Sequence, residues 1–94
     1  ATSSIDWLRR VEMPEISRFY GIIIKLFFGD HPPPHFHAVY GEYVALFNID
    51  TLDMIEGDLP PRARKLVVEW ASTYQQDLKR MWMKQQFQKL PPLQ

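Results

Sequence analysis

The spacing of hydrophobic residues changes halfway along the chain. Residues 16–28 are mostly β-branched or aromatic and apolar on both alternating faces, which predicts one long central strand. A second strand is predicted over residues 36–40, and Gly41-Glu42 then forms a tight turn into a third over residues 43–49. Residues 52–56 predict a fourth, short strand. Consecutive short strands joined by tight turns indicate an antiparallel meander.

The second half of the chain has helical spacing. Asp58 followed by Pro60 and Pro61 predicts a helix start, with Asp58 as N-cap. The helix is expected to run to about Gln86, either straight or as two pieces joined at a bend, and to end before Pro91-Pro92. Apolar residues recur at steps of three or four, and we interpret them as core: Ala63, Leu66, Val67, Trp70, Ala71, Tyr74, Leu78, Met81 and Trp82.

The predicted fold is therefore α+β: a three- to four-stranded antiparallel meander sheet with one long (or bent) C-terminal amphipathic helix packed on one face. The chain of 94 residues is long enough for one domain, which we place at residues 13–94. Residues 1–12 look like an N-terminal extension. Their apolar residues have helical spacing, so they are interpreted either as a short docking helix or as a segment foreign to the domain.

Composition narrows the class of protein. The chain has no cysteine, which excludes disulfides and thiolate metal sites. The apolar run at residues 21–26 contains Lys25 and is too short to span a bilayer, so we expect a cytoplasmic protein without a membrane partner.

The charges are segregated, although the formal net charge is zero. Residues 41–58 carry five acidic side chains and no Lys or Arg, whereas residues 59–94 carry seven basic and two acidic ones. Neutrality argues against binding nucleic acid by bulk charge. A basic helix face could still meet RNA or an acidic partner, or could simply be a solvated exterior.

All three histidines lie between residues 31 and 37, in the segment Asp-His-Pro-Pro-Pro-His-Phe-His that begins at Asp30. In a strand His35 and His37 share one face, about 6.5 Å apart by strand rise, while Phe36 points into the core. Such a pair suits a divalent metal such as Zn. It equally suits a general acid and base beside a phosphate, or two histidines with structural roles only.

His31 is harder to include in the same site. Three consecutive prolines in polyproline II would hold His31 about 12 Å from His35. One metal could bind both His31 and His35 only if a cis peptide folded the loop, or if His31 came from a second chain. A site made of His35 and His37 with a carboxylate from elsewhere or from a second chain is easier to build. The sequence contains no Gly-rich phosphate loop and no Gly-x-Ser-x-Gly nucleophile turn.

Several segments together resemble a bacterial family catalogued as domain of unknown function 4160. They are Met-Pro-Glu-Ile-Ser-Arg-Phe-Tyr-Gly from Met13, the histidine segment, Tyr-Gly-Glu-Tyr from Tyr40, Leu-Pro-Pro-Arg-Ala from Leu59 and Val-Glu-Trp-Ala from Val68. The resemblance covers residues 13 to about 85. It implies no reaction, but members of this kind are often encoded beside a second small protein, as in toxin–antitoxin pairs. The motif that it implies consists of Arg18, Tyr20, His31, His35, His37 and Glu42.

Three functions are compatible with these features. The first is a protein-interaction module of a toxin–antitoxin-like gene pair, whose partner is a small protein encoded nearby. The second is a ribonuclease-like toxin, in which His35 and His37 transfer protons and Arg18 or Lys25 stabilises phosphate charge. The third is a divalent transition-metal-binding protein with His35 and His37 as ligands.

We also expect a homo-oligomer or a hetero-oligomer rather than a stable monomer. One helix covers only one face of a sheet, and large uncovered apolar patches usually mark interaction sites. The alternative is that residues 5–11 fold back over the exposed face and keep the chain monomeric.

Overall fold

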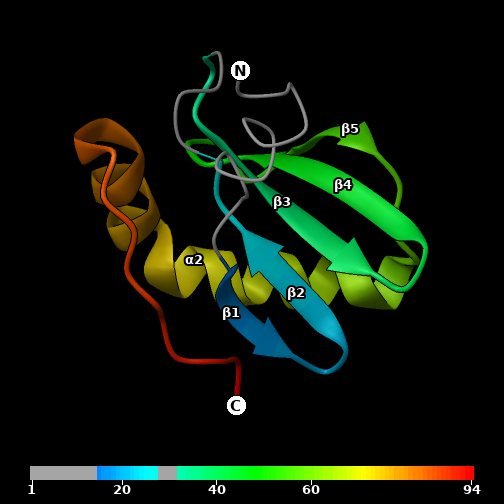
Figure 1. Ribbon diagram of the computed structural model, residues 1–94. Coiled ribbons are helices and arrows are strands. Elements are labelled where there is room, and N and C mark those ends of the chain that lie inside the picture. Colours follow the sequence, from blue (N-terminus) through cyan, green and yellow to red (C-terminus); the bar gives the residue numbers. More distant parts are fainter. Residues whose placement is uncertain (1–14, 28–31) are drawn as a thin grey trace, which may run out of the picture.

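A computed structural model describes residues 15–27 and 32–94. In this part of the chain, a five-stranded antiparallel sheet with its strands in sequence order is followed by one long helix (Figure 1). The predicted α+β meander is therefore confirmed. The elements are β1 (Glu15–Phe19), β2 (Ile22–Lys25), β3 (His35–Tyr40), β4 (Tyr43–Asn48), β5 (Met54–Gly57) and α2 (Pro61–Lys84).

The long strand predicted over residues 16–28 is wrong, because the chain reverses in its middle. β1 and β2 form a hairpin in which Phe19 pairs with Ile22. The two turn residues, Tyr20 and Gly21, have φ angles of 49° and 80°. Two positive φ angles are typical of the type I′ turn that joins two-residue hairpins. The prediction failed because apolar residues on both sides of Gly21 concealed the turn.

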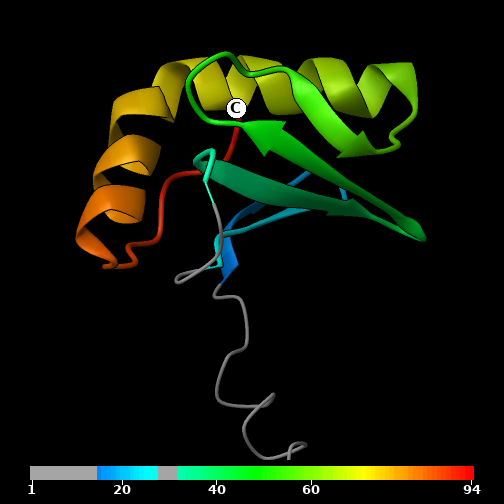
Figure 2. The same cartoon turned by 90° about the horizontal axis from the view of Figure 1, so that it is seen from above.

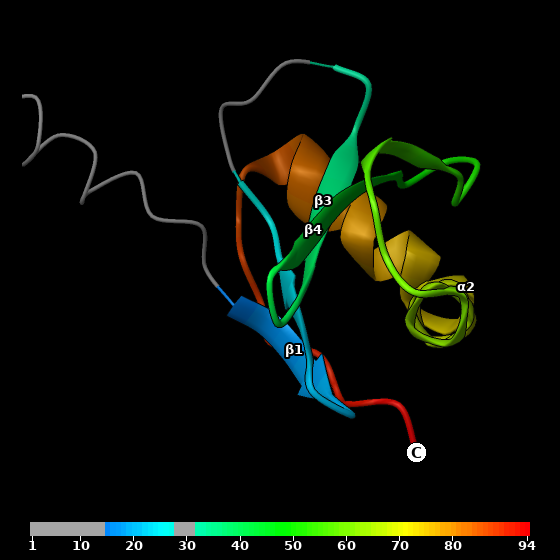
Figure 3. The ribbon, with the colours of Figure 1, turned by 90° about the vertical axis from the view of Figure 1, so that its right-hand side faces the viewer.

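α2 lies against one face of the sheet (Figures 2 and 3). Along β2, Ile22 and Ile24 are completely buried, whereas Ile23 and Lys25 on the other face are only partly buried. The same alternation buries Phe36 of β3 and Phe47 of β4. These strands therefore contribute alternate residues to a single core under the helix.

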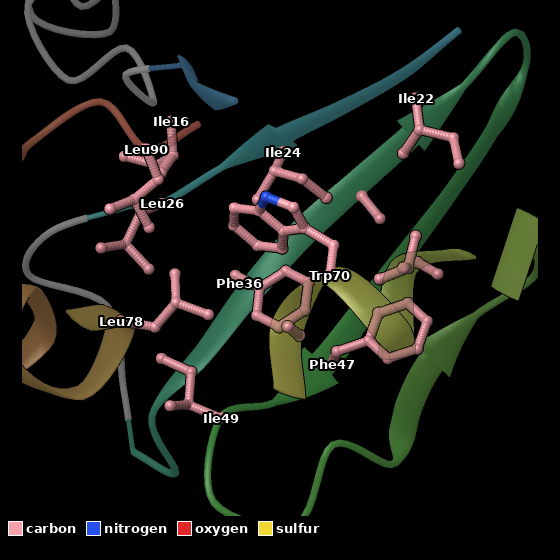
Figure 4. Packing of buried hydrophobic residues seen from close by; sticks show 14 of the residues in the cluster. Ile16, Ile22, Ile24, Leu26, Phe36, Phe47, Ile49, Trp70, Leu78 and Leu90 are labelled. Atoms are coloured by element: carbon pink, nitrogen blue, oxygen red, sulfur yellow. The ribbon is translucent and has the colours of Figure 1, made fainter. Parts of the chain in front are cut away.

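The centre of that core is aromatic (Figure 4). Trp70 of α2 is completely buried, and its ring lies 6.2 Å from Phe36 and 5.6 Å from Phe19, centroid to centroid. Phe36 in turn stacks on Phe47 at 5.4 Å. These separations are within the range in which aromatic pairs attract each other beyond simple burial. The interpretation of the helical aromatic residues as core is confirmed.

The start of α2 differs from the prediction. Pro60 is the N-cap residue, with φ −57° and ψ 147°, and Pro61 is the first helical residue. A residue that precedes proline is kept out of the α region by the proline ring, so the helix cannot begin before Pro61. Asp58 is not the cap, and its N–H donates instead to the carbonyl of Val44, at 3.2 Å.

α2 bends at Tyr74 and ends at a left-handed residue, Gln85. Tyr74 has non-helical angles of φ −110° and ψ 19°, which confirms the alternative of two pieces joined at a bend. The helix ends at Gln85, whose left-handed φ of 55° places its N–H on the carbonyl of Met81. Pro91-Pro92 lies further on and does not set the end.

The C-terminal tail returns to the sheet beside β1. The N–H of Leu90 donates to the carbonyl of Ile16, at 2.9 Å. The carbonyl of Pro91 accepts from both Ser17 Oγ, at 3.2 Å, and Trp70 Nε1, at 2.9 Å. The tail therefore ties the β1 end of the sheet to the helix.

No helix in the described part of the chain combines the length and apolarity that crossing a membrane requires.

Candidate functional site

His35 and His37 lie at the start of β3, on the face opposite to Phe36. Their ring centroids are 5.6 Å apart, as the two-residue spacing in a strand predicted. Phe36 between them is completely buried in the core, which fixes the strand beneath the two rings. The backbone thus presents the pair on one surface.

His35 is held rigidly. Its side chain is buried, and Nδ1 lies 2.8 Å from the carbonyl oxygen of Pro33. Because a carbonyl only accepts hydrogen bonds, Nδ1 carries the proton, and Nε2 of the neutral ring has the lone pair. The ring of Trp82 lies 5.1 Å from that of His35. Trp82 follows the bend at Tyr74, so the bent helix covers one side of the histidine pair.

A row of residues crosses the sheet at His37. His37 pairs with Lys25 of β2 and Leu46 of β4, and Lys25 pairs with Glu15 of β1. Directly paired residues lie about 5 Å apart, so Lys25 is the cation that the sheet register places beside His37.

Arg18 occupies a different position. It lies on β1 opposite Ile23, so β2 separates it from β3 by two strand spacings, or about 10 Å. Its guanidinium bonds the carboxylate of Glu15 at 2.7 Å. The structure therefore joins Arg18 to Glu15, and of the two cations considered, Lys25 is the one next to the histidines.

Replacing Arg18 with alanine is expected to raise the pKa of Glu15. In the folded chain the hydrogen bond from Arg18 holds the pKa of this carboxyl below its ordinary value, and the neighbouring charge of Lys89 and Lys25 adds to the effect. Because the pKa of Glu15 is lower in the folded chain, its ionised carboxylate stabilises the fold at pH values above the unfolded pKa. This stabilisation is lost as the pH falls through the folded pKa. An NMR titration of the Glu15 carboxyl carbon tests this, and an unchanged pKa in Arg18→Ala would refute the assignment.

The remaining motif residues are dispersed. Tyr20 is 60% exposed in the β1–β2 turn, and Glu42 is exposed in the β3–β4 turn. His31 lies outside the described residues, although the neighbouring Pro32–Pro33 peptide is cis. No group of three His, Cys, Asp or Glu side chains suited to a metal ion occurs among residues 15–27 and 32–94.

A groove that the sequence did not predict lies between the first half of α2 (residues 61–73) and strands β4 and β5. Its volume is about 1200 Å³. Apolar lining comes from Tyr43, Met54, Leu59 and Val68, and charged groups stand around it: Asp58, Arg64, Lys65 and Glu69. The shape of the groove depends on the position of β5 relative to α2, which the short connection between them determines. The periodicity of apolar residues along the chain does not encode that position.

The strand beside this groove is also exposed. Ile55 of β5 is 46% exposed, Glu56 is exposed, and Tyr43 at the start of β4 is 44% exposed. The described part of the chain therefore offers two candidate sites: the histidine pair on β3, and the groove with the exposed strand β5.

A meander sheet with one covering helix and a histidine pair on its third strand defines a small α+β domain. The model of the family described as Domain of unknown function (DUF4160) matches residues 21–83, more than half of the chain, and the chain belongs to this family. No curated protein and no solved structure matches the chain significantly. The family assignment confirms the resemblance found in the sequence and brings no activity with it.

Proposed function

We propose that this chain is a protein-interaction module, one half of a toxin–antitoxin-like pair of small proteins. The observation that carries the proposal is the groove of about 1200 Å³, lined by Tyr43, Met54, Leu59 and Val68 and bordered by an exposed strand. Aromatic side chains and methionine are enriched at the centres of protein interfaces, and grooves beside secondary-structure elements accept peptide segments.

The rest of the surface supports the same function. Several large hydrophobic side chains are exposed in the described part of the chain: Tyr20, Tyr40, Tyr43, Val44, Ile55, Met83 and Phe87. Along the sequence, acidic side chains are also concentrated in residues 41–58 and basic ones in residues 59–94. Charge segregation of this kind favours specific partners and rapid association.

Co-expression with the protein encoded by the neighbouring gene tests the proposal. We expect one heteromeric complex in size-exclusion chromatography with light scattering, persisting at physiological salt. Two independent species under these conditions would remove the basis of the proposal.

Self-association belongs to the same proposal. We expect the purified chain to form a homo-oligomer through exposed apolar side chains outside β5, such as Tyr20, Met83 and Phe87. Light scattering at micromolar concentration, on the full chain and on a chain lacking residues 1–12, measures this. A monomer in both would contradict self-association and leave the heteromeric complex to be judged separately.

The second candidate function is a ribonuclease-like toxin, and the geometry of the histidine pair favours it. The carbonyl of Pro33 fixes the tautomer of His35, and His37 lies 5.6 Å away beside Lys25. One histidine would remove a proton from the RNA 2′-hydroxyl and the other would protonate the leaving oxygen, while Lys25 stabilises the phosphate charge.

For this candidate, His37→Ala is the informative variant, because His37 is less buried than His35 and contributes less to packing. Expression of the native chain would arrest growth and cleave RNA, and His37→Ala would lower cleavage about 100-fold or more. Arg18→Ala, which lies away from the pair, is the control and should retain activity. Cleavage that survives in His37→Ala would rule out this mechanism.

A further inference from the structure

We infer that β5 binds an extended, basic segment of the partner protein, which adds to the sheet as a sixth strand and fills the groove beside α2. This inference rests on the proposed interaction function and specifies its surface and the chemistry of its ligand.

The first argument is that β5 is a sheet edge. In the strand order, β5 pairs only with β4 and stands at the end of the described sheet. The opposite end is different, because the tail residues Leu90 and Pro91 bond to Ile16 and Ser17 of β1. An edge strand presents a row of backbone N–H and C=O groups, which is the template for adding a strand from another chain.

The second argument comes from the register of β5. Met54 pairs with the buried Phe47 and lines the groove, whereas Glu56 pairs with Leu46, in the row that contains His37. Side chains of an added strand alternate between the same two faces. Residues beside Met54 would therefore enter the apolar groove near Leu59 and Val68, and residues beside Glu56 would face its carboxylate.

The third argument is charge. β5 (Met-Ile-Glu-Gly) has one charged side chain, the exposed carboxylate of Glu56. Pairing two copies through β5 would bring the two Glu56 side chains close together, and like charges across strands are destabilising. Lys or Arg at alternate positions of a foreign strand would instead attract Glu56. The edge thus disfavours a second copy of this chain and favours a segment of alternating apolar and basic residues.

The irregular pairing of β5 agrees with this selectivity. The register shifts between Leu46 and Phe47, which pair with Glu56 and Met54, so that Ile55 is left as the extra residue of a bulge. Bulges and charges on edge strands discourage indiscriminate pairing. A partner must match both the local shape and the charge of β5.

A peptide titration of the full chain tests the inference. The probe is a short fluorescein-labelled peptide of alternating lysine and valine, and the comparison peptide alternates glutamate and valine. Fluorescence anisotropy should show binding of the basic peptide, weaker binding of the acidic one, and loss of affinity as salt screens the charges. Equal affinity for both peptides, or no binding of the basic one, would overturn the inference.

Reversing one charge on β5 makes the test specific. Glu56→Lys is expected to weaken binding of the basic peptide roughly tenfold, because an attraction between paired strands is lost and a repulsion replaces it. The same variant should bind the acidic peptide more tightly than the native chain does. Glu42→Lys makes the same charge change in the exposed β3–β4 turn and should alter either affinity less than about twofold.

Both variants should fold, because neither side chain is buried. Thermal unfolding of the two variants checks this. Equal losses in Glu56→Lys and Glu42→Lys would mean that only bulk charge matters, and the inference would be wrong. The same two variants in the co-expression experiment separate the two proposals. If the native chain forms the complex and Glu56→Lys forms it equally well, docking on β5 is wrong but the interaction function stands. If the native chain forms no complex, the interaction function itself is wrong.

Discussion

Replacing Trp70 with alanine is expected to destabilise the fold by about 3–5 kcal/mol, the usual cost of truncating a buried aromatic residue. Trp70 is completely buried and contacts aromatic rings from β1, β3 and its own helix. It also anchors the tail through the bond from Nε1 to the carbonyl of Pro91. Small domains have a total stability of about 5–15 kcal/mol, so the variant should be close to unfolding at room temperature. Urea denaturation followed by circular dichroism measures the loss.

Two further variants show which contacts matter. Trp70→Phe keeps much of the packing but removes the hydrogen bond to Pro91, and we expect it to lose clearly less than the alanine variant. Met83→Ala, at a position of α2 that is 80% exposed, should change stability by less than about 0.5 kcal/mol. A Trp70→Ala variant as stable as Met83→Ala would contradict the described core.

Gly57→Ala is expected to have the second large effect, a loss of about 3 kcal/mol or more. Gly57 ends β5 with φ 88°, and an added Cβ would lie 2.8 Å from Cα of Ala45 and closer still to the carbonyl oxygen of Val44. Both atoms belong to the backbone of β4, so relief requires the strands to separate. Strained backbone alone costs about 1–3 kcal/mol, and the steric overlap adds to it.

Gly41→Ala is the matched control for this substitution. Gly41 also has a positive φ, of 59°, but an added Cβ there would meet no atom within 4 Å. The control should therefore show only the cost of the left-handed backbone, about 1–2 kcal/mol. Equal losses in the two variants would argue against the described close approach of β5 to β4.

The regular part of this fold could be predicted from sequence because each element repeats a simple pattern. Helical spacing from Ala63 to Trp82 marked α2, and the tight turn at Gly41-Glu42 between two short runs of strand-forming residues marked β3 and β4. The β1–β2 hairpin was missed because its strands are apolar on both sides of the turn. The start of α2 was misplaced because Asp58 looked like a cap, whereas the consecutive prolines at 60 and 61 determine where the helix begins.

Only the part of the candidate site that depends on residues close together in the sequence could be predicted. Spacing along one strand brought His35 and His37 together, and it assigned Phe36 to the core. The cover of Trp82 over His35 depends on the bend at Tyr74, and the place of Lys25 beside His37 depends on strand register. The groove depends on how β5 and α2 are set against each other, which is a tertiary property.

The measurement that tests the central claim most directly is amide hydrogen exchange of the chain, alone and in complex with its partner. A partner strand on β5 would form new backbone hydrogen bonds, so the amides of Met54–Gly57 that point away from β4 should exchange rapidly in the free chain and more slowly in the complex. Amides of β3, which is already paired on both sides, should change little. Protection confined to other elements, with exchange of β5 unchanged, would contradict the account.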